Sequence, residues 1–130
     1  MVYLKKNNKK NISISVVSHK NTRELFKLLK DLDKFNKYIK EIIITYNTNE
    51  KHLNVKKFKN IIKIIKNKSK KGFGENHNNA FRKTSGKFFC ILNPDISIKN
   101  NVFLNLQKFC EKKEKSIISP LVLGDKFTKN

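Results

Sequence analysis

The sequence has only two cysteines, and their positions exclude the common cysteine-based sites. Cys90 and Cys110 form no Cys-x-x-Cys pair, and two such distant thiols cannot make up a structural zinc site. We therefore expect both to be buried as small hydrophobic side chains in a reducing compartment.

Long apolar runs are also absent. No stretch approaches the roughly 18 consecutive apolar residues of a membrane-spanning helix. The polar, lysine-rich segment 1–11 is followed by no apolar stretch long enough for a signal peptide. These absences predict a cytoplasmic protein, and its many lysines are compatible with peripheral contact with the inner face of an anionic membrane.

Arginine is scarce, although the formal net charge is +20. Arg23 and Arg82 are the only arginines, and the lysines are spread along the chain among asparagines and isoleucines. A clustered basic patch would favour nucleic acid, because it releases counterions when it binds phosphates. A diffuse distribution favours a solvated lysine-rich surface instead. The net charge alone is therefore no evidence for a dedicated polyanion-binding site.

Short β-branched apolar runs alternate with segments of helical spacing along the chain. We expect strands at residues 12–18, 41–46, 61–65, 88–92 and 116–119. Helices are expected at about 22–38, at about 75–85, and after a cap at Asn100 or Asn101. Gly86 suits the C-terminal cap of the second helix. This order predicts an α/β fold, with a mostly parallel sheet and helices on both faces.

The 130 residues allow one domain with one core. We place that domain at residues 12–123. Residues 1–11 are expected to be a flexible basic N-terminus, and residues 124–130 a loose C-terminus.

Polar residues follow four of the expected strands. They are Ser18-His19, Asn47, Lys71-Gly72-Phe73-Gly74 and Asn93-Pro94-Asp95. Open parallel sheets bind their ligands at the carboxyl ends of the strands. These four places therefore define the candidate binding site.

The same residues resemble a known family when they are taken in order. The motifs are Val-Val-Ser-His (16–19), an apolar strand ending in Asn47, Gly-Phe-Gly-Glu-Asn-His-Asn-Asn-Ala-Phe (72–81) and Ser-Gly-Lys-Phe-Phe-Cys-Ile-Leu-Asn-Pro-Asp (85–95). Each motif is weak alone, but the set in this order resembles the family 2 glycosyltransferases of the GT-A fold, especially their rhamnosyltransferase-like branch. The resemblance covers about residues 12–123, and it implies the Rossmann-like half that binds a nucleotide-diphospho-sugar.

The resemblance implies a metal site at Asp95. This residue matches the last acid of the family's Asp-x-Asp motif, which holds Mg²⁺ or Mn²⁺ against the nucleotide diphosphate. Asn93 stands in place of the first acid, and a neutral amide contributes less charge. The residues alone leave a second interpretation open, in which Asn-Pro-Asp is an ordinary turn that ends a strand.

The glycine segment is expected to face the phosphates. Gly72 and Gly74 let the backbone approach a ligand, the following helix points free N–H groups toward it, and Lys71 adds positive charge. By resemblance, Asn78 faces the nucleotide-sugar site. A solvated helix position is the alternative for Asn78.

The remaining expected contacts are with the nucleotide. By resemblance, Ser18 and His19 border the base and ribose, and Asn47 lies beside them. Many relatives carry an acid where this chain has Tyr46, and that acid contacts the base. Tyr46 cannot replace it, so the sequence leaves the preferred nucleotide open.

The resemblance implies inverting transfer of a hexose or deoxyhexose to a glycan or lipid-linked acceptor. Family members carry the catalytic base and the acceptor site beyond the fifth strand. This chain ends at Asn130, so we expect a donor-binding domain that lacks the acceptor half, and the identity of the base is unknown. A truncated product and an assembly in which another chain supplies the rest both stay open.

An RNA-binding domain is the alternative from another class. Lys71-Gly72-Phe73-Gly74 opens like an RNP1 motif, but the Glu-Asn-His-Asn that follows offers no aromatic platform on which bases could stack. A dinucleotide-binding fingerprint is incomplete without its third glycine, and Ser85-Gly86-Lys87 precedes a strand rather than the helix of a P-loop. We therefore expect no specific nucleic-acid partner.

Overall fold

The structure is a computed structural model, and it describes residues 10–113 and 115–121. The chain divides into two compact units, one that ends at Lys99 and one that begins at Asn100. The first unit holds a parallel sheet with two helices, and the second holds one helix. The expected loose ends, apart from residues 10 and 11, lie outside the described residues.

The sheet of the first unit has four strands. They are β1 (Ile12–Ser18), β2 (Ile39–Tyr46), β3 (Ile62–Lys66) and β4 (Phe88–Leu92). Their spatial order is β3-β2-β1-β4, and every pair is parallel. β1 therefore lies between two neighbours, which explains why its sequence turns fully apolar, as in a strand that is covered on both faces.

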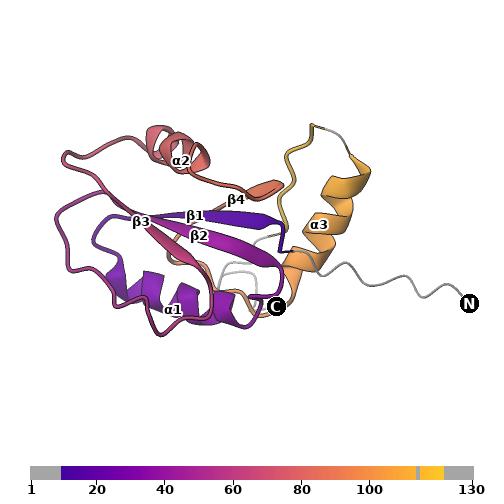
Figure 1. The fold of residues 1–130 in the computed structure, drawn as a ribbon, viewed down its shortest axis with the longest axis horizontal. Helices are drawn as coiled ribbons and strands as arrows, with labels where there is room; N and C mark the ends of the chain where they lie inside the picture. The colour runs from indigo at the N-terminus through magenta and orange to yellow at the C-terminus, as the bar shows by residue number, and fades with distance from the viewer. Residues whose placement is uncertain (1–9, 114, 122–130) are drawn as a thin grey trace, which may run out of the picture. The chain divides into compact units, whose positions relative to one another are not determined.

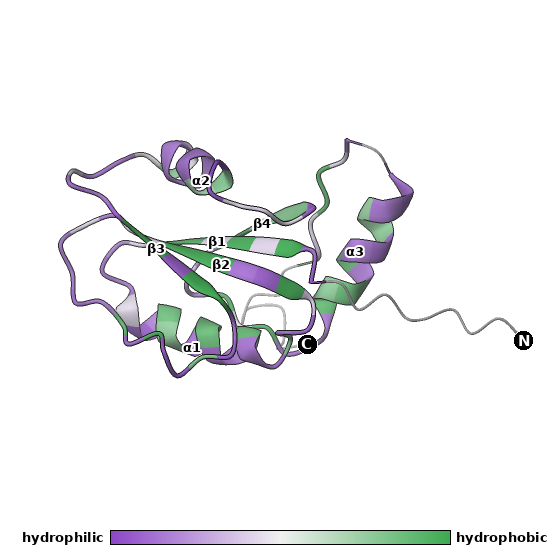
Figure 2. Ribbon diagram, viewed as in Figure 1, coloured by the Kyte–Doolittle hydropathy of each residue, from purple (hydrophilic) through white to green (hydrophobic). Residues whose placement is uncertain are grey.

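The helices α1 (Thr22–Asp33) and α2 (Phe73–Phe81) lie on opposite faces of the sheet (Figure 1). The strands are largely hydrophobic, and the helices carry hydrophilic residues on their outer sides (Figure 2). This arrangement confirms the expected α/β fold with helices on both faces. The helix α1 buries four leucines, which are Leu25, Leu28, Leu29 and Leu32. Burial of each such side chain contributes about 1.5–3 kcal/mol.

The first helix is shorter than its sequence pattern predicts. Apolar spacing continues to residue 38, but α1 ends at Asp33 and a series of tight turns follows. The carbonyl oxygen of Tyr38 accepts hydrogen bonds from the backbone N–H groups of Asn11 (3.2 Å) and Ile12 (3.3 Å). This pairing starts β2 at Ile39, directly beside β1, and a longer helix would prevent it.

The expected glycine cap of the second helix is wrong. The helix α2 begins at Phe73 and ends at Phe81, and its C-terminal cap is Arg82 in the right-handed helical region. Gly86 instead lies against β1, where an added Cβ atom would come within 2.5 Å of the Ser13 side-chain oxygen and 2.7 Å of the Asn11 carbonyl oxygen. Glycine is needed there because the two backbones approach so closely.

The second unit contains α3 (Val102–Lys112). The Asn101 side chain accepts a hydrogen bond from the Leu104 backbone N–H (3.3 Å), which confirms Asn101 as its cap. The expected strand at 116–119 is wrong, because these residues pair with no strand of the described chain and Ile117 is fully exposed. A β-branched run without a neighbour cannot complete its backbone hydrogen bonds as a strand.

Within the described residues, no helix combines the length and the apolar character that crossing a membrane requires.

A buried carboxylate ties the amino-terminal part of the sheet to the segment before β4. Glu41 is 3% exposed and accepts hydrogen bonds from the Ser13 hydroxyl (2.8 Å) and from the Ser85 backbone N–H (2.6 Å) and hydroxyl (3.0 Å). It also pairs with the Lys63 ammonium group. Burial alone would raise its pKa, but the bonds from Lys63, Ser85 and Ser13 outweigh burial and lower the pKa to about 2.

Glu41 should make the stability of the chain depend on acid pH. Its pKa is lower in the folded chain, about 2 against a usual value of 4.5, so its contribution is complete above pH 4.5 and is lost as the pH falls toward 2. The shift corresponds to about 3 kcal/mol in the free energy of unfolding. Urea unfolding of the wild type and of Glu41→Gln, measured across this pH range, should show a steeper loss in the wild type. Equal slopes would contradict this account, and Glu111→Gln, on an exposed residue of α3, is the control.

Candidate functional site

The carboxyl ends of all four strands lie at one edge of the sheet, because every strand pair is parallel. Ser18 ends β1, Asn47 follows β2, Asn67 follows β3, and Asn93 follows β4. Open parallel sheets bind their ligands at this edge. The structure therefore brings the strand-end residues that the sequence predicts to the expected edge.

Asn47 binds the backbone of Lys71 in both directions. Its side-chain oxygen accepts from the Lys71 N–H (2.9 Å), and its side-chain nitrogen donates to the Lys71 carbonyl oxygen (3.0 Å). The same nitrogen lies 3.5 Å from Nδ1 of His19. Asn47 is only 5% exposed, so its amide acts as a fixed clamp between the end of β2 and the segment that begins α2.

Two further asparagines complete this amide network, and the sequence interpretation missed their role. The Asn67 side chain donates to the side-chain oxygens of Asn47 (2.9 Å) and Asn76 (2.7 Å). Asn76, which is buried on α2, donates to the Lys71 carbonyl oxygen (3.2 Å). The available signal was Asn76 itself, because asparagine is unfavourable inside a helix and usually has a reason to be there.

The glycine segment leaves the amino end of α2 open. Gly72 precedes the helix in an extended conformation, and no side chain caps the first helical N–H groups. A Cβ atom added at Gly72 or Gly74 would meet no other atom within 4 Å, so both glycines border open space. Lys71 lies beside this space and pairs with Glu75 one turn into the helix (3.0 Å). Free N–H groups and a lysine make this end of α2 suited to an anion.

The exit of β1 is held by a residue that the sequence interpretation did not single out. The Ser18 side chain is fully buried and donates to Oε2 of Glu50 (2.7 Å). Its neighbour His19 is exposed at the same edge of the sheet. Of these two predicted contact residues, His19 therefore presents its ring to solvent while the hydroxyl of Ser18 is turned inward.

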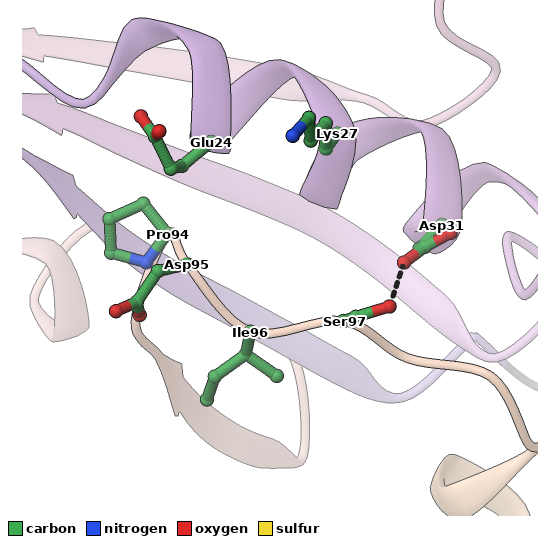
Figure 3. Close-up of a pocket in the computed structure, with 7 residues that line it drawn as sticks. All are labelled: Glu24, Lys27, Asp31, Pro94, Asp95, Ile96 and Ser97. Carbon is green, nitrogen blue, oxygen red and sulfur yellow. Dashed lines mark hydrogen bonds between the residues drawn. The ribbon is translucent and has the colours of Figure 1, made fainter. Parts of the chain in front are cut away.

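Asp95 lines a hollow of about 330 Å³ beside α1 (Figure 3). The hollow is lined by Glu24, Lys27, Asp31, Pro94, Asp95, Ile96 and Ser97. Asn93 and Asp95 are exposed, and the Ile96 N–H donates to the Asn93 carbonyl oxygen (3.4 Å), which closes a turn. The predicted turn and the predicted acid are thus present in one short segment.

Asp31 fixes the far side of this hollow. Its carboxylate accepts from the Ser97 hydroxyl (3.3 Å) and from the Ile98 N–H (3.1 Å), and it pairs with Lys34 (2.9 Å). Burial acts to raise its pKa, but the bonds from Lys34, Ile98 and Ser97 outweigh burial and lower the pKa. Asp31 is thereby kept ionised as an anchor for the segment that carries Asp95.

The carboxylates of this edge suit a hard cation that keeps most of its water. No group of three potential metal-binding side chains occurs in the described part of the chain. Magnesium is usually held by one or two carboxylates together with substrate phosphates and water. Asp95 is exposed and forms no ion pair with another described residue, and Glu24 lines the same hollow. Asp95 would therefore supply one carboxylate to such an ion, and Lys27 lines the same hollow.

The neighbouring α2 residues Asn78 and His77 differ in burial. Asn78 is exposed on α2, whereas the neighbouring His77 is 3% exposed and its Nδ1 lies 2.8 Å from the Ser15 hydroxyl of β1. Burial lowers the pKa of His77, which favours the neutral ring. His77 therefore anchors α2 on the sheet, as expected of a residue that faces away from Asn78.

Tyr46 takes a structural role at the position where an acid was expected by resemblance. It is 1% exposed, its hydroxyl accepts from the Leu53 N–H (2.9 Å), and its ring stacks on His52 with 4.1 Å between ring centroids. Burial of the phenol raises its pKa, so the ring stays neutral. Buried Tyr46 therefore stabilises the loop after β2 through its contacts with Leu53 and His52.

The RNP1 alternative conflicts with the secondary structure. Phe73 is the first residue of α2, whereas the aromatic residues of RNP1 lie on a strand, where bases stack across the sheet. The Phe73 ring instead contacts the edge of His77, with 4.4 Å between ring centroids. The Lys-Gly-Phe-Gly segment therefore opens a helix and provides no such platform.

The family now follows from sequence comparison. Residues 13–128 match the family described as Glycosyl transferase family 2. This match spans most of the chain, and the chain belongs to this family. No curated protein sequence matches the chain.

Two solved structures from S. aureus share the fold. The one described as "Crystal structure of S. aureus TarS 1-349" is similar with a TM-score of 0.67 at 20% identity, over 78% of this chain and 32% of that chain. The one described as "Crystal structure of S. aureus TarS" has a TM-score of 0.67 at 19% identity, over 78% of this chain and 20% of that chain. The likeness confirms the expected Rossmann-like GT-A fold, and this chain spans about a third of the TarS 1-349 chain and a fifth of the longer TarS chain.

The Asn47 clamp should be far more important for stability than the exposed Asn78. Asn47→Ala leaves the backbone N–H and carbonyl groups of Lys71 without these partners, so we expect a loss of about 1–3 kcal/mol in the free energy of unfolding. Asn78→Ala, a matched change on an exposed helix position, should alter it by at most about 0.5 kcal/mol. Chemical unfolding measures both, and hydrogen exchange of the Lys71 amide should accelerate only in Asn47→Ala. Equal effects of the two changes would refute the clamp.

Proposed function

We propose that this chain binds a nucleotide-diphospho-sugar together with Mg²⁺ or Mn²⁺, and that it serves the transfer of a hexose or deoxyhexose to a glycan or lipid-linked acceptor. The observation that carries the proposal is the meeting of four strand ends at one edge of a family 2 glycosyltransferase sheet. That edge holds an exposed carboxylate, an exposed histidine and an uncapped helix beside a lysine. These groups are suited to the cation, the nucleotide and the diphosphate of such a donor, respectively.

The diphosphate would lie between the glycine segment and the acid of the turn after β4. Gly72 and Gly74 border open space, and the first N–H groups of α2 and the ammonium group of Lys71 supply positive potential there. Asp95 would hold the cation, and Asn93 would hydrogen-bond the ribose or a water molecule of the ion. A bound divalent cation neutralises the charge of the departing diphosphate.

The nucleotide would extend toward the exit of β1. His19 is exposed beside Asn47, which contacts its Nδ1, so its Nε2 would be offered to a ribose or base. Ser18 and Asn47 are buried, so in this proposal they shape the pocket and border the nucleotide. Asn78 is exposed in the second half of α2, and in this proposal it would hydrogen-bond the sugar.

Transfer with inversion needs a base on the opposite face of the sugar, close to the acceptor hydroxyl. We assign that base and the acceptor site to a part of the protein other than this donor site, because the chain spans only 32% of the TarS 1-349 chain that shares its fold. The rhamnosyl-like specificity rests on the Asn-Pro-Asp form of the metal motif alone. Peripheral contact with an anionic membrane is proposed from the net charge of +20.

Calorimetric titration with UDP-sugars and dTDP-sugars tests the proposal. In the presence of Mn²⁺ the wild-type chain should bind one of them, and Asp95→Ala should weaken that binding at least about tenfold, because the cation loses its carboxylate. Glu111→Ala removes another carboxylate, on α3, and should leave binding unchanged. Binding that does not depend on the metal, or no binding at all, would contradict the proposal.

A further inference from the structure

Glu50 gathers four hydrogen bonds at the exit of the two central strands. Its Oε2 accepts from the hydroxyls of Ser18 (2.7 Å) and Thr22 (3.1 Å). Its Oε1 accepts from the Lys20 backbone N–H (3.0 Å) and the Thr48 hydroxyl (3.1 Å). Glu50 forms no ion pair with another described residue, so hydrogen bonds alone stabilise its charge.

The donors come from two loops that the strands place side by side. Ser18 ends β1, Lys20 lies in the turn that follows it and Thr22 begins α1. Thr48 belongs to the loop after β2, as does Glu50 itself. Lys20 has a φ of 64°, in the left-handed region that non-glycine residues adopt only when their surroundings hold them there. Glu50 supplies that support, because it accepts the hydrogen bond from the Lys20 amide.

His19 lies within the turn that Glu50 holds. Its backbone N–H donates to the Asn21 side-chain oxygen (3.3 Å), and its Nδ1 lies 3.5 Å from the side-chain nitrogen of Asn47. The residues before and after it, Ser18 and Lys20, both bind Glu50. The direction in which His19 presents its exposed ring is therefore set by contacts from both sides.

We propose that Glu50 is a positioning residue of the donor site, which holds the turn from β1 into α1 so that His19 presents its ring to the nucleotide. This inference rests on the proposed function. Glu50 does not itself reach the donor, because its four bonds turn the carboxylate toward the chain. Its effect on binding passes through His19.

An ionised carboxylate is suited to this task because it only accepts hydrogen bonds. Burial acts to raise the pKa of Glu50, but the bonds from Lys20, Ser18, Thr48 and Thr22 outweigh burial and lower the pKa. Glu50 is therefore charged near neutral pH, and all four donors can be satisfied together.

Glu50→Gln tests the charge while it keeps the size of the side chain. One oxygen becomes an NH₂ group, which cannot accept a bond. The Lys20 N–H is fixed by the backbone, so the remaining oxygen must serve it, and the hydroxyls of Ser18 and Thr22 lose their acceptor. Thr22 has an alternative partner in the Lys51 carbonyl oxygen (3.2 Å), which favours a folded variant with a loosened turn.

Asp33 offers a matched control at the other edge of the sheet. Its carboxylate accepts from the Lys59 N–H (3.0 and 3.1 Å), the Asn60 N–H (3.4 Å) and the Asn60 side chain (3.0 Å). These residues precede β3, so they lie at its amino end. Asp33→Asn disturbs a comparable set of bonds far from the candidate donor site, and it measures the purely structural effect.

The dissociation constants of UDP and dTDP, each with Mn²⁺, are measured by calorimetry at a temperature at which circular dichroism shows every variant folded. We expect Glu50→Gln to bind the preferred nucleotide about tenfold more weakly, and Asp33→Asn to remain within about twofold of the wild type. In a chain that already carries His19→Ala, Glu50→Gln should have an effect of at most about twofold, as a double-mutant cycle requires of coupled residues.

Wild-type affinity in Glu50→Gln, or an equal loss in Asp33→Asn, would overturn the positioning role while the proposed function stands. A tenfold loss that persists in the His19→Ala chain would show that Glu50 acts by another route, and would likewise overturn the inference. Failure of the wild-type chain to bind either nucleotide would contradict the proposed function, and the inference with it.

Discussion

Parallel pairing of β1 with both β2 and β4 is the constraint on which the candidate site depends. Ile14 at the centre of β1 is in register with Ile42 on one side and Cys90 on the other. Because all three strands run in the same direction, their carboxyl ends must meet at one edge. Ser18, Asn47 and Asn93, which are far apart in the sequence, therefore lie along the same edge of the sheet.

Most buried polar groups at this edge hydrogen-bond to the loops that follow the strands, and so fix the positions of those loops. Asn47 clamps the Lys71 backbone, and Glu50 holds the turn that contains His19. Without these contacts both loops would have to become ordered when a ligand binds, and that ordering would cost conformational entropy. In the proposed site, the exposed groups that would contact a donor are chiefly His19, Asp95 and the amino end of α2.

The strands could be predicted well because each is a β-branched or aromatic run bounded by polar residues. The first and fourth strands have the predicted bounds, 12–18 and 88–92. The end of α1 could not be predicted, since its apolar spacing continues through Tyr38, and only pairing with β1 reveals the turn. The strand expected at 116–119 has a suitable pattern, but a strand also needs a neighbour, which a pattern does not reveal.

The site could be predicted in part. The rule that ligands bind after parallel strands located Ser18, Asn47, Lys71 and Asp95, because it needs only the order of the elements. It did not distinguish exposed side chains from buried ones, and it missed Asn67, Asn76 and Glu50. Their roles depend on hydrogen bonds between loops that are 9 to 32 residues apart in sequence, and such bonds have no local signature.

The chain belongs to glycosyltransferase family 2, and its fold is similar to that of TarS. Paramagnetic broadening by Mn²⁺ measures the central claim most directly. In amide spectra of the chain with UDP or dTDP, the account predicts that Mn²⁺ broadens the signals of His19, Gly72 and Asp95 together and spares Glu41 and Gly86 near the opposite edge. Broadening confined to Asp95, or spread evenly over the lysine-rich surface, would contradict a single donor site at the carboxyl edge of the sheet.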